Sequence, residues 1–97
     1  IYKMFIVGDI GNTDTKICLV NSRKKIIRKI NFSSKKITST QLKDKFRKLK
    51  LQNLSLKKCL FCSVVPTTFK IIKKYIKKNH KVKCFELKDL KIEKLIK

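Results

Sequence analysis

A carboxylate, a glycine and several short polar side chains lie close together near the start of the chain, in the segment 9–16, Asp-Ile-Gly-Asn-Thr-Asp-Thr-Lys. Gly11 can adopt positive φ and allows backbone N–H groups to come close to an anion. Successive N–H groups in such a turn form an anion-binding concavity. Asp9 suits Mg²⁺, because this ion favours one or two carboxylates together with waters and phosphate oxygens. The other polar donors and the cation of the segment are Asn12, Thr13, Thr15 and Lys16. The segment predicts a site for a phosphate and its magnesium, with a plain hairpin turn as the alternative.

Apolar runs on both sides of this segment predict the strands that position it. Residues 2–8 are apolar on both faces of a strand, which suits the centre of a sheet. Residues 16–21 indicate a second strand, and residues 26–32 a third with charges between the apolar side chains. The short turns between these runs predict two successive antiparallel hairpins.

A helix with a clear start signal follows the third strand. Thr38 and Gln41 have the spacing of a capping box, and Ile37 and Leu42 can form a hydrophobic staple around it. Apolar residues then recur at helical spacing, so one face of this helix is expected to pack on the sheet.

The second half of the chain repeats the pattern of a strand and a helix. Residues 56–64 indicate a strand that comes after a helical crossover, so we expect it to run parallel to the first strand. Pro66 fits the first turn of the next helix. We place the end of that helix at Asn79, because asparagine tolerates the left-handed conformation. A fifth strand over residues 82–87 completes an α/β domain of order βββαβαβ, with helices packed on a mixed five-stranded sheet.

Two segments of the chain resemble motifs of a known family. Residues 9–13, Asp-Ile-Gly-Asn-Thr, resemble the first phosphate motif Asp-x-Gly-x-Thr of the sugar-kinase, Hsp70 and actin superfamily. Their form and their place near the N-terminus are similar to those of type III pantothenate kinases. Residues 62–66, Cys-Ser-Val-Val-Pro, resemble that family's Ser-Ser-Val-Val-Pro, although Cys62 stands where the family usually has serine.

The resemblance implies a ribonuclease-H-like fold of the actin-like ATPase type. Residues 1–97 would be the N-terminal lobe of a two-lobed kinase. Independently of the resemblance, we expect Met4 to be the natural start, because it lies just before the first strand. Residues 88–97 would form a short helix or the linker to the second lobe. The family's general base is an aspartate in a Gly-x-Asp-Arg motif, which is expected beyond Lys97. We therefore expect these residues alone not to turn over substrate.

The resemblance also implies an activity and roles for individual residues. Type III pantothenate kinases transfer the γ-phosphoryl group of ATP to pantothenate, the first step of coenzyme A biosynthesis. Asp9 would hold Mg²⁺ through water, and Ser63 and Val64 would border the substrate pocket or merely shape the turn from strand to helix. The implied phosphate-binding residues are Asp9, Gly11, Asn12, Thr13, Thr15 and Lys16. A monovalent cation, K⁺ or NH₄⁺, and a homodimer of the full-length protein are implied as well.

The charge of the chain raises the question of a nucleic-acid partner. Lysine and arginine number 27 against six acidic residues, a formal net charge of +21. Such an excess is typical of proteins that neutralise phosphates. However, only three of these cations are arginines, the side chains favoured for reading bases. The lysines are also spread along the chain. We do not expect nucleic acid to be the main partner, although the charge should attract anions at low salt.

The four cysteines are expected to be buried and reduced. Cys59 and Cys62 have the Cys-x-x-Cys spacing, but no second pair follows and a strand would place them on opposite faces. Free thiols imply a reducing compartment. The sequence shows no secretory signal pattern and no apolar stretch near the roughly 20 residues that span a bilayer. These features predict a cytoplasmic protein without a membrane segment. His80 is expected to be an exposed turn residue without a catalytic role.

Three other functions remain open from the sequence. The chain could be an ATP-binding lobe of another kinase in the same superfamily. It could be a small basic module that binds RNA or DNA through its lysines. It could also be a structural remnant that pairs with a separately encoded second half.

Overall fold

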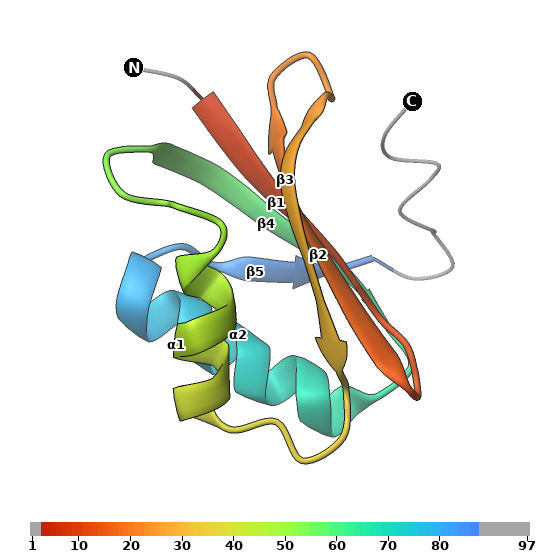
Figure 1. Ribbon diagram of the computed structural model, residues 1–97. Coiled ribbons are helices and arrows are strands. Elements are labelled where there is room, and N and C mark those ends of the chain that lie inside the picture. Colours follow the sequence, from red (N-terminus) through yellow and green to blue (C-terminus); the bar gives the residue numbers. More distant parts are fainter. Residues whose placement is uncertain (1–2, 88–97) are drawn as a thin grey trace.

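The computed structural model describes residues 3–87, which form a mixed β-sheet and two helices (Figure 1). Residues 88–97, predicted as a short helix or linker, lie outside the described residues. The elements in chain order are β1 Lys3–Ile10, β2 Asp14–Asn21, β3 Ile26–Ser33, α1 Ser39–Arg47, β4 Ser55–Ser63, α2 Pro66–His80 and β5 Cys84–Glu86. The predicted order βββαβαβ is confirmed.

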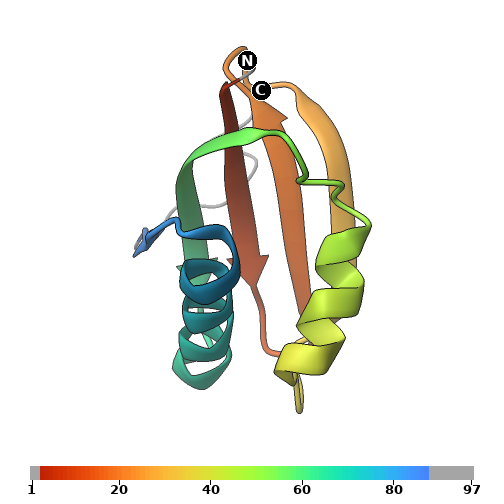
Figure 2. The ribbon, with the colours of Figure 1, turned by 90° about the vertical axis from the view of Figure 1, so that its left-hand side faces the viewer.

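The five strands lie in the spatial order β3-β2-β1-β4-β5. β1, β2 and β3 are joined by antiparallel pairing, as the two hairpins predict. β4 lies parallel to β1 after the α1 crossover, and β5 lies parallel to β4. Both helices cover the same face of the sheet (Figure 2). This order and polarity are those expected for the ribonuclease-H-like fold.

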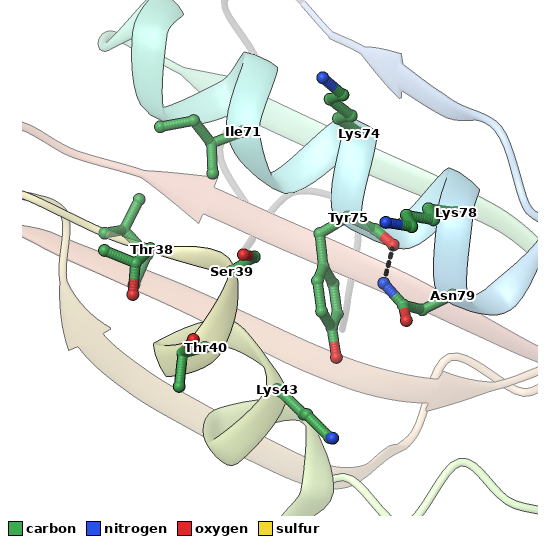
Figure 3. Close-up of a pocket in the computed structure, with 10 residues that line it drawn as sticks. Thr38, Ser39, Thr40, Lys43, Ile71, Lys74, Tyr75, Lys78 and Asn79 are labelled. Carbon is green, nitrogen blue, oxygen red and sulfur yellow. Dashed lines mark hydrogen bonds between the residues drawn. The ribbon is translucent and has the colours of Figure 1, made fainter.

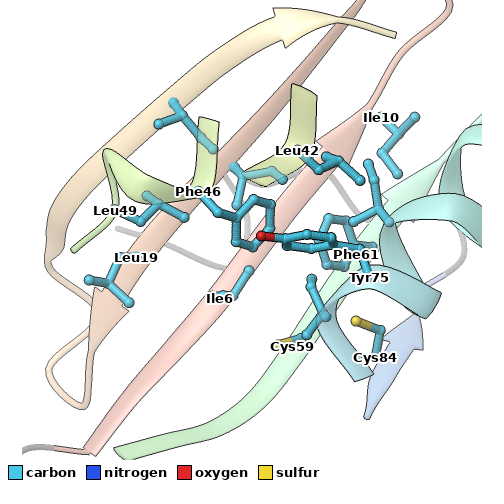
Figure 4. Packing of buried hydrophobic residues seen from close by; sticks show 14 of the residues in the cluster. Ile6, Ile10, Leu19, Leu42, Phe46, Leu49, Cys59, Phe61, Tyr75 and Cys84 are labelled. Atoms are coloured by element: carbon cyan, nitrogen blue, oxygen red, sulfur yellow. The ribbon is translucent and has the colours of Figure 1, made fainter. Parts of the chain in front are cut away.

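The core lies between the helices and that face of the sheet (Figure 4). Alternate residues of β1 contribute Ile6 and Ile10, which are fully buried. Phe46 of α1 meets Tyr75 of α2 edge to face, with ring centroids 5.1 Å apart. Each fully buried aliphatic side chain, such as that of Ile6 or Ile10, stabilises the fold by about 1.5–3 kcal/mol. The sheet therefore provides a fixed platform for the loops at its ends.

The start of α1 confirms the predicted capping box. The Gln41 N–H donates to Thr38 Oγ1 at 3.2 Å, and the Thr38 N–H donates to Gln41 Oε1 at 3.0 Å. Ile37 and Leu42, the expected staple residues, are both buried in the core. Two of the four free N–H groups at a helix start are satisfied in this way.

The end of α2 differs from the prediction. The helix continues through His80, and Lys81 adopts the left-handed conformation with φ 59°. Asn79 stays helical, and its side-chain amide donates to the Tyr75 carbonyl at 2.9 Å. The Lys81 N–H closes the helix by donating to the Lys77 carbonyl at 3.2 Å. A lysine therefore takes the position that we assigned to asparagine.

His80 is not an exposed turn residue, so that prediction is wrong. It is half-buried at the end of α2 and stacks on Phe46, with centroids 5.8 Å apart and planes inclined by 22°. Its Nε2 atom is buried and has no hydrogen-bond partner among residues 3–87. Burial lowers the pKa of His80 below its ordinary value of 6.5, because it disfavours the charged imidazolium.

The four cysteines are buried and form no disulfide, as predicted. Cys59 and Cys84 are neighbours in the parallel pairing of β4 and β5 (Figure 4). The thiol–thiol hydrogen bond with Cys84 and burial raise the pKa of Cys59, so its thiol stays protonated. Within residues 3–87 no group of three metal-ligating side chains is present. No helix among those residues has the length and apolar character needed to cross a membrane.

Candidate functional site

The predicted phosphate segment forms a hairpin tip that is shorter than expected. β1 continues through Asp9 to Ile10, and β2 already begins at Asp14. The antiparallel pairing extends as far as Ile10 and Thr15, which leaves only residues 11–13 as a loop. Asp9 is half-buried inside the sheet, opposite Lys16 of β2 and level with Cys62 of β4.

Gly11 shapes this loop in a different way from the one predicted. No glycine among the described residues has positive φ, so Gly11 does not use the left-handed conformation that is open to it. The Gly11 N–H closes the turn by donating to the Asp14 carbonyl at 2.9 Å. A Cβ added at Gly11 would lie 3.2 Å from that same oxygen, tighter than ordinary contact. Gly11 therefore allows a close backbone approach, and its N–H is occupied within the turn.

Asn12 and Thr13 form the exposed tip of the loop. In the described part of the chain, neither of their N–H groups donates a hydrogen bond outside the strand ladders. The Thr13 carbonyl accepts the Ser34 N–H at 2.8 Å, which joins the loop to the connection between β3 and α1. The tip therefore has backbone donors without a partner among residues 3–87, while the Thr13 carbonyl is held by Ser34.

Thr15 and Lys16 point to opposite faces of the sheet, because neighbouring residues of a strand alternate. Lys16 is exposed and lies across the ladder from Asp9. Thr15 is fully buried, and its Oγ1 lies 2.7 Å from Ser34 Oγ. The structure thus brings Asp9 and Lys16 together and places the Thr15 hydroxyl in the core.

The second motif lies beside the first. Ser63, the last residue of β4, pairs with Ile10, and the Val64 N–H donates to the Ile10 carbonyl at 3.0 Å. The Ser63 hydroxyl donates to the Val65 carbonyl and accepts the Val65 N–H, both at 3.1 Å. It therefore shapes the turn into α2, whereas the Val64 side chain is 64% exposed beside the loop. The carboxyl ends of adjacent parallel strands are where open α/β sheets bind ligands.

Three residues at this end of the sheet were missed in the sequence analysis. Ser34 and Thr68 are buried and hydrogen-bond to one another or to the hairpin, but no local pattern distinguishes them. Gly8 lies under the ring of Phe61, which a Cβ would approach to 2.1 Å. For Gly8 a signal existed, since a glycine inside an apolar strand indicates close approach of another group.

A hollow of about 610 Å³ lies elsewhere, between α1 and α2 (Figure 3). Tyr75 lies at its centre, and Lys43, Lys74 and Lys78 stand around it. None of the residues that we predicted to bind phosphate lines it. The hollow and the hairpin tip are therefore separate regions, which we call the helix groove and the phosphate loop (residues 11–13).

Comparisons with known proteins agree with the motifs. A family model described as type III pantothenate kinase matches residues 5–97. The type III pantothenate kinase of Pelagibacter ubique (strain HTCC1062) is 54% identical over 94 residues, which are 97% of this chain. The chain spans 38% of the length of that relative. Among solved structures, the Aquifex aeolicus member of the Ppx/GppA protein family aligns with a TM-score of 0.45 and 10% identity, over 92% of this chain and 36% of that one.

Proposed function

The chain belongs to the type III pantothenate kinase family, and we propose that the full-length protein transfers the γ-phosphoryl group of ATP to pantothenate. The products would be 4′-phosphopantothenate and ADP. The observation that carries the proposal is the Val64 N–H bond to the Ile10 carbonyl, which places the family's two motif segments side by side. The family match over residues 5–97 favours this activity over a basic nucleic-acid module or a different kinase of the superfamily.

Phosphoryl transfer depends mainly on positioning and on neutralising the charge of the phosphate oxygens. In the proposal, the free N–H groups of Asn12 and Thr13 bind phosphate oxygens at the exposed tip. Lys16 adds positive charge beside them. Gly11 lets the loop turn tightly, and Thr15 supports it from the core.

Asp9 would hold Mg²⁺ through water. Its half-buried carboxylate forms no hydrogen bond or ion pair with a side chain among residues 3–87. A single carboxylate fits Mg²⁺, which keeps several waters and takes its other ligands from substrate phosphates. When bound, the ion would neutralise charge on the transferring phosphoryl group.

Val64 is proposed to border the pocket for pantothenate. An exposed valine next to the phosphate loop offers apolar contact to the body of the substrate. Ser63 would act by holding the backbone turn that presents Val64, since its hydroxyl is used within that turn. The proposal thus places Val64 at the substrate pocket and gives Ser63 the role of shaping the turn from strand to helix.

Other parts of the proposal come from the family. The general base would lie in a Gly-x-Asp-Arg motif of the second lobe, residues 1–97 would form the first lobe, and the 97 residues alone would be inactive. A monovalent cation, K⁺ or NH₄⁺, a homodimer and a cytoplasmic location are proposed on the same basis. No residue described here is assigned to the monovalent cation or to the dimer.

The experiment is an assay of the purified full-length protein with ATP, Mg²⁺ and pantothenate. We expect ADP release that depends on pantothenate, and mass spectrometry should detect 4′-phosphopantothenate. Omitting K⁺ and NH₄⁺ tests the monovalent cation separately. ADP release that ignores pantothenate and responds to another alcohol would contradict the proposed substrate. Steady pantothenate-dependent turnover by the 97-residue chain would contradict the proposed need for a second lobe.

A further inference from the structure

Ser34 uses all of its polar groups to join three separate segments. It lies in the connection between β3 and α1 and is 3% exposed. Its N–H donates to the Thr13 carbonyl at 2.8 Å, and its Oγ lies 2.7 Å from Thr15 Oγ1. Its carbonyl accepts the Thr68 hydroxyl at 2.9 Å. No sequence motif contains this serine.

The three partners of Ser34 belong to segments that border the candidate site. Thr13 belongs to the phosphate loop, Thr15 to the start of β2, and Thr68 to the first turn of α2, which follows Val64 in the chain. Figure 1 shows these segments at the same end of the molecule, where β1 and β2 meet the start of α2. Thr15 and Thr68 are both buried, at 0% and 4% exposure.

Such a buried and satisfied chain of hydrogen bonds fixes geometry. Hydrogen bonds are stronger in the low-dielectric interior, and a buried polar group left unpaired is costly. The loop therefore keeps its hydroxyl and carbonyl partners only in one position relative to β4 and α2. Positioning errors of about 1 Å can reduce a reaction rate by about 10²-fold.

We propose that Ser34 is a positioning residue, which holds the phosphate loop in register with the Val64 turn through Thr13, Thr15 and Thr68. Ser34 touches neither substrate nor phosphate in this role. The inference rests on the proposed function, because it assumes that residues 11–13 receive the phosphates of ATP. It also gives Thr15 a role that suits its buried hydroxyl.

The test compares Ser34→Ala, Thr15→Val and the double variant in the full-length protein. Each single change leaves one buried hydroxyl without its partner, so both should lower the thermal midpoint. The double variant removes both hydroxyls, and its midpoint should return most of the way toward wild type. Hydrogen exchange of peptides covering residues 9–16 should be faster in all three variants. The KM for ATP should rise or kcat fall, with kcat/KM reduced roughly 10-fold.

Thr38→Ala is the matched control. It removes the capping box of α1 and lowers stability, yet Thr38 has no bond to the phosphate loop among the described residues. We expect its midpoint to fall while exchange in residues 9–16 and the KM for ATP stay at wild-type values. A merely structural Ser34 would behave in the same way as this control.

The outcomes separate this inference from the proposed function. A double variant that regains wild-type exchange and kcat/KM together with its stability would overturn the positioning role. Unchanged exchange of residues 9–16 in both single variants would overturn it as well. Because exchange needs no substrate, this readout remains decisive if the wild-type protein fails to phosphorylate pantothenate. That failure would overturn the proposed function by itself.

Discussion

The phosphate loop and the helix groove are built in opposite ways. At the phosphate loop, backbone and hydroxyl groups from several segments hydrogen-bond to one another, and few charged side chains are present. The helix groove is a hollow of about 610 Å³ with Lys43, Lys74 and Lys78 among its lining residues. The hydrogen bond between its lining residues in Figure 3 joins Asn79 to Tyr75 within one helix. The groove is therefore charged but loosely organised, whereas the loop is organised with little charge.

If the phosphate loop receives the phosphates of ATP, as proposed, net charge is a poor guide to the site in this chain. The chain has a formal net charge of +21, and three lysines line the helix groove although none of the predicted phosphate-binding residues does. Exposed lysines are hydrated and mobile, and salt screens them over about 10 Å. Fixed donors in a built loop lose little entropy when they bind an anion, which is the property that phosphoryl transfer needs.

The largest expected effect comes from changing the carboxylate at the loop. Asp9→Asn in the full-length protein removes the charge that would hold Mg²⁺, and kcat should fall by about 10²–10³-fold. The thermal midpoint should stay close to that of wild type, because Asp9 forms no ion pair within residues 3–87. Steady-state assays and thermal unfolding measure the two effects. Asp14→Asn, an exposed aspartate of the same hairpin without an assigned role, is the control. Equal losses in the two variants would remove Asp9 from its proposed role.

The next effect concerns the packing beneath the loop. Gly8→Ala would place a Cβ 2.1 Å from the Phe61 ring, so the ring or β1 must move. Overpacking of this kind destabilises a protein by about 1–3 kcal/mol. Ile71→Ala is the control in the helix groove. Ile71 is 39% exposed, and its loss should change stability by less than about 1 kcal/mol. Chemical denaturation compares them, and a Gly8→Ala protein as stable as Ile71→Ala would show that the sheet end tolerates shifts.

The sequence was sufficient for those features that local patterns determine. Alternating and continuous apolar runs predicted all five strands, and the spacing of Thr38 and Gln41 predicted the start of α1. The motif residues Asp9 and Ser63 were predicted at strand ends, and the structure places their segments together. These features depend on residues a few positions apart, where side-chain periodicity and capping act directly.

The features that the sequence could not predict depend on distant residues. Ser34 is 19 positions from Thr15 and 34 from Thr68, so no local pattern marks their hydrogen bonds. The inward position of Thr15 followed only once β2 was known to begin at Asp14. Gly11 does not use the positive φ that glycine can adopt, and the turn closes by a bond from the Gly11 N–H to the Asp14 carbonyl. His80 became half-buried because α2 continued one residue further and brought its ring onto Phe46.

A smaller effect should appear at the end of α2 in acid. The pKa of His80 is lowered in the folded protein by burial, while the unfolded chain keeps a value near 6.5. Below that pH the unfolded state binds more protons than the folded state, so the free energy of unfolding falls as pH falls. His80→Gln cannot titrate in this range. On going from neutral pH to well below 6.5, the thermal midpoint of wild type should therefore fall more than that of His80→Gln. A pH-independent difference would show that the imidazole is accessible to water in the fold.

The smallest effect should come from the lysines of the groove. Replacing Lys43, Lys74 and Lys78 together by glutamine removes three exposed charges from the helix groove. None of the predicted phosphate-binding residues lines this groove. The free energy of unfolding should change by less than about 0.5 kcal/mol for each, because exposed substitutions rarely do more. The kcat/KM for ATP should change by less than about twofold at physiological salt, where surface charges are largely screened. At low salt a modest decrease is expected, since the chain loses part of the field that attracts anions. A loss at physiological salt as large as that of Asp9→Asn would mean that the groove takes part in binding ATP. In that case organised hydrogen bonding would not be what separates the two regions.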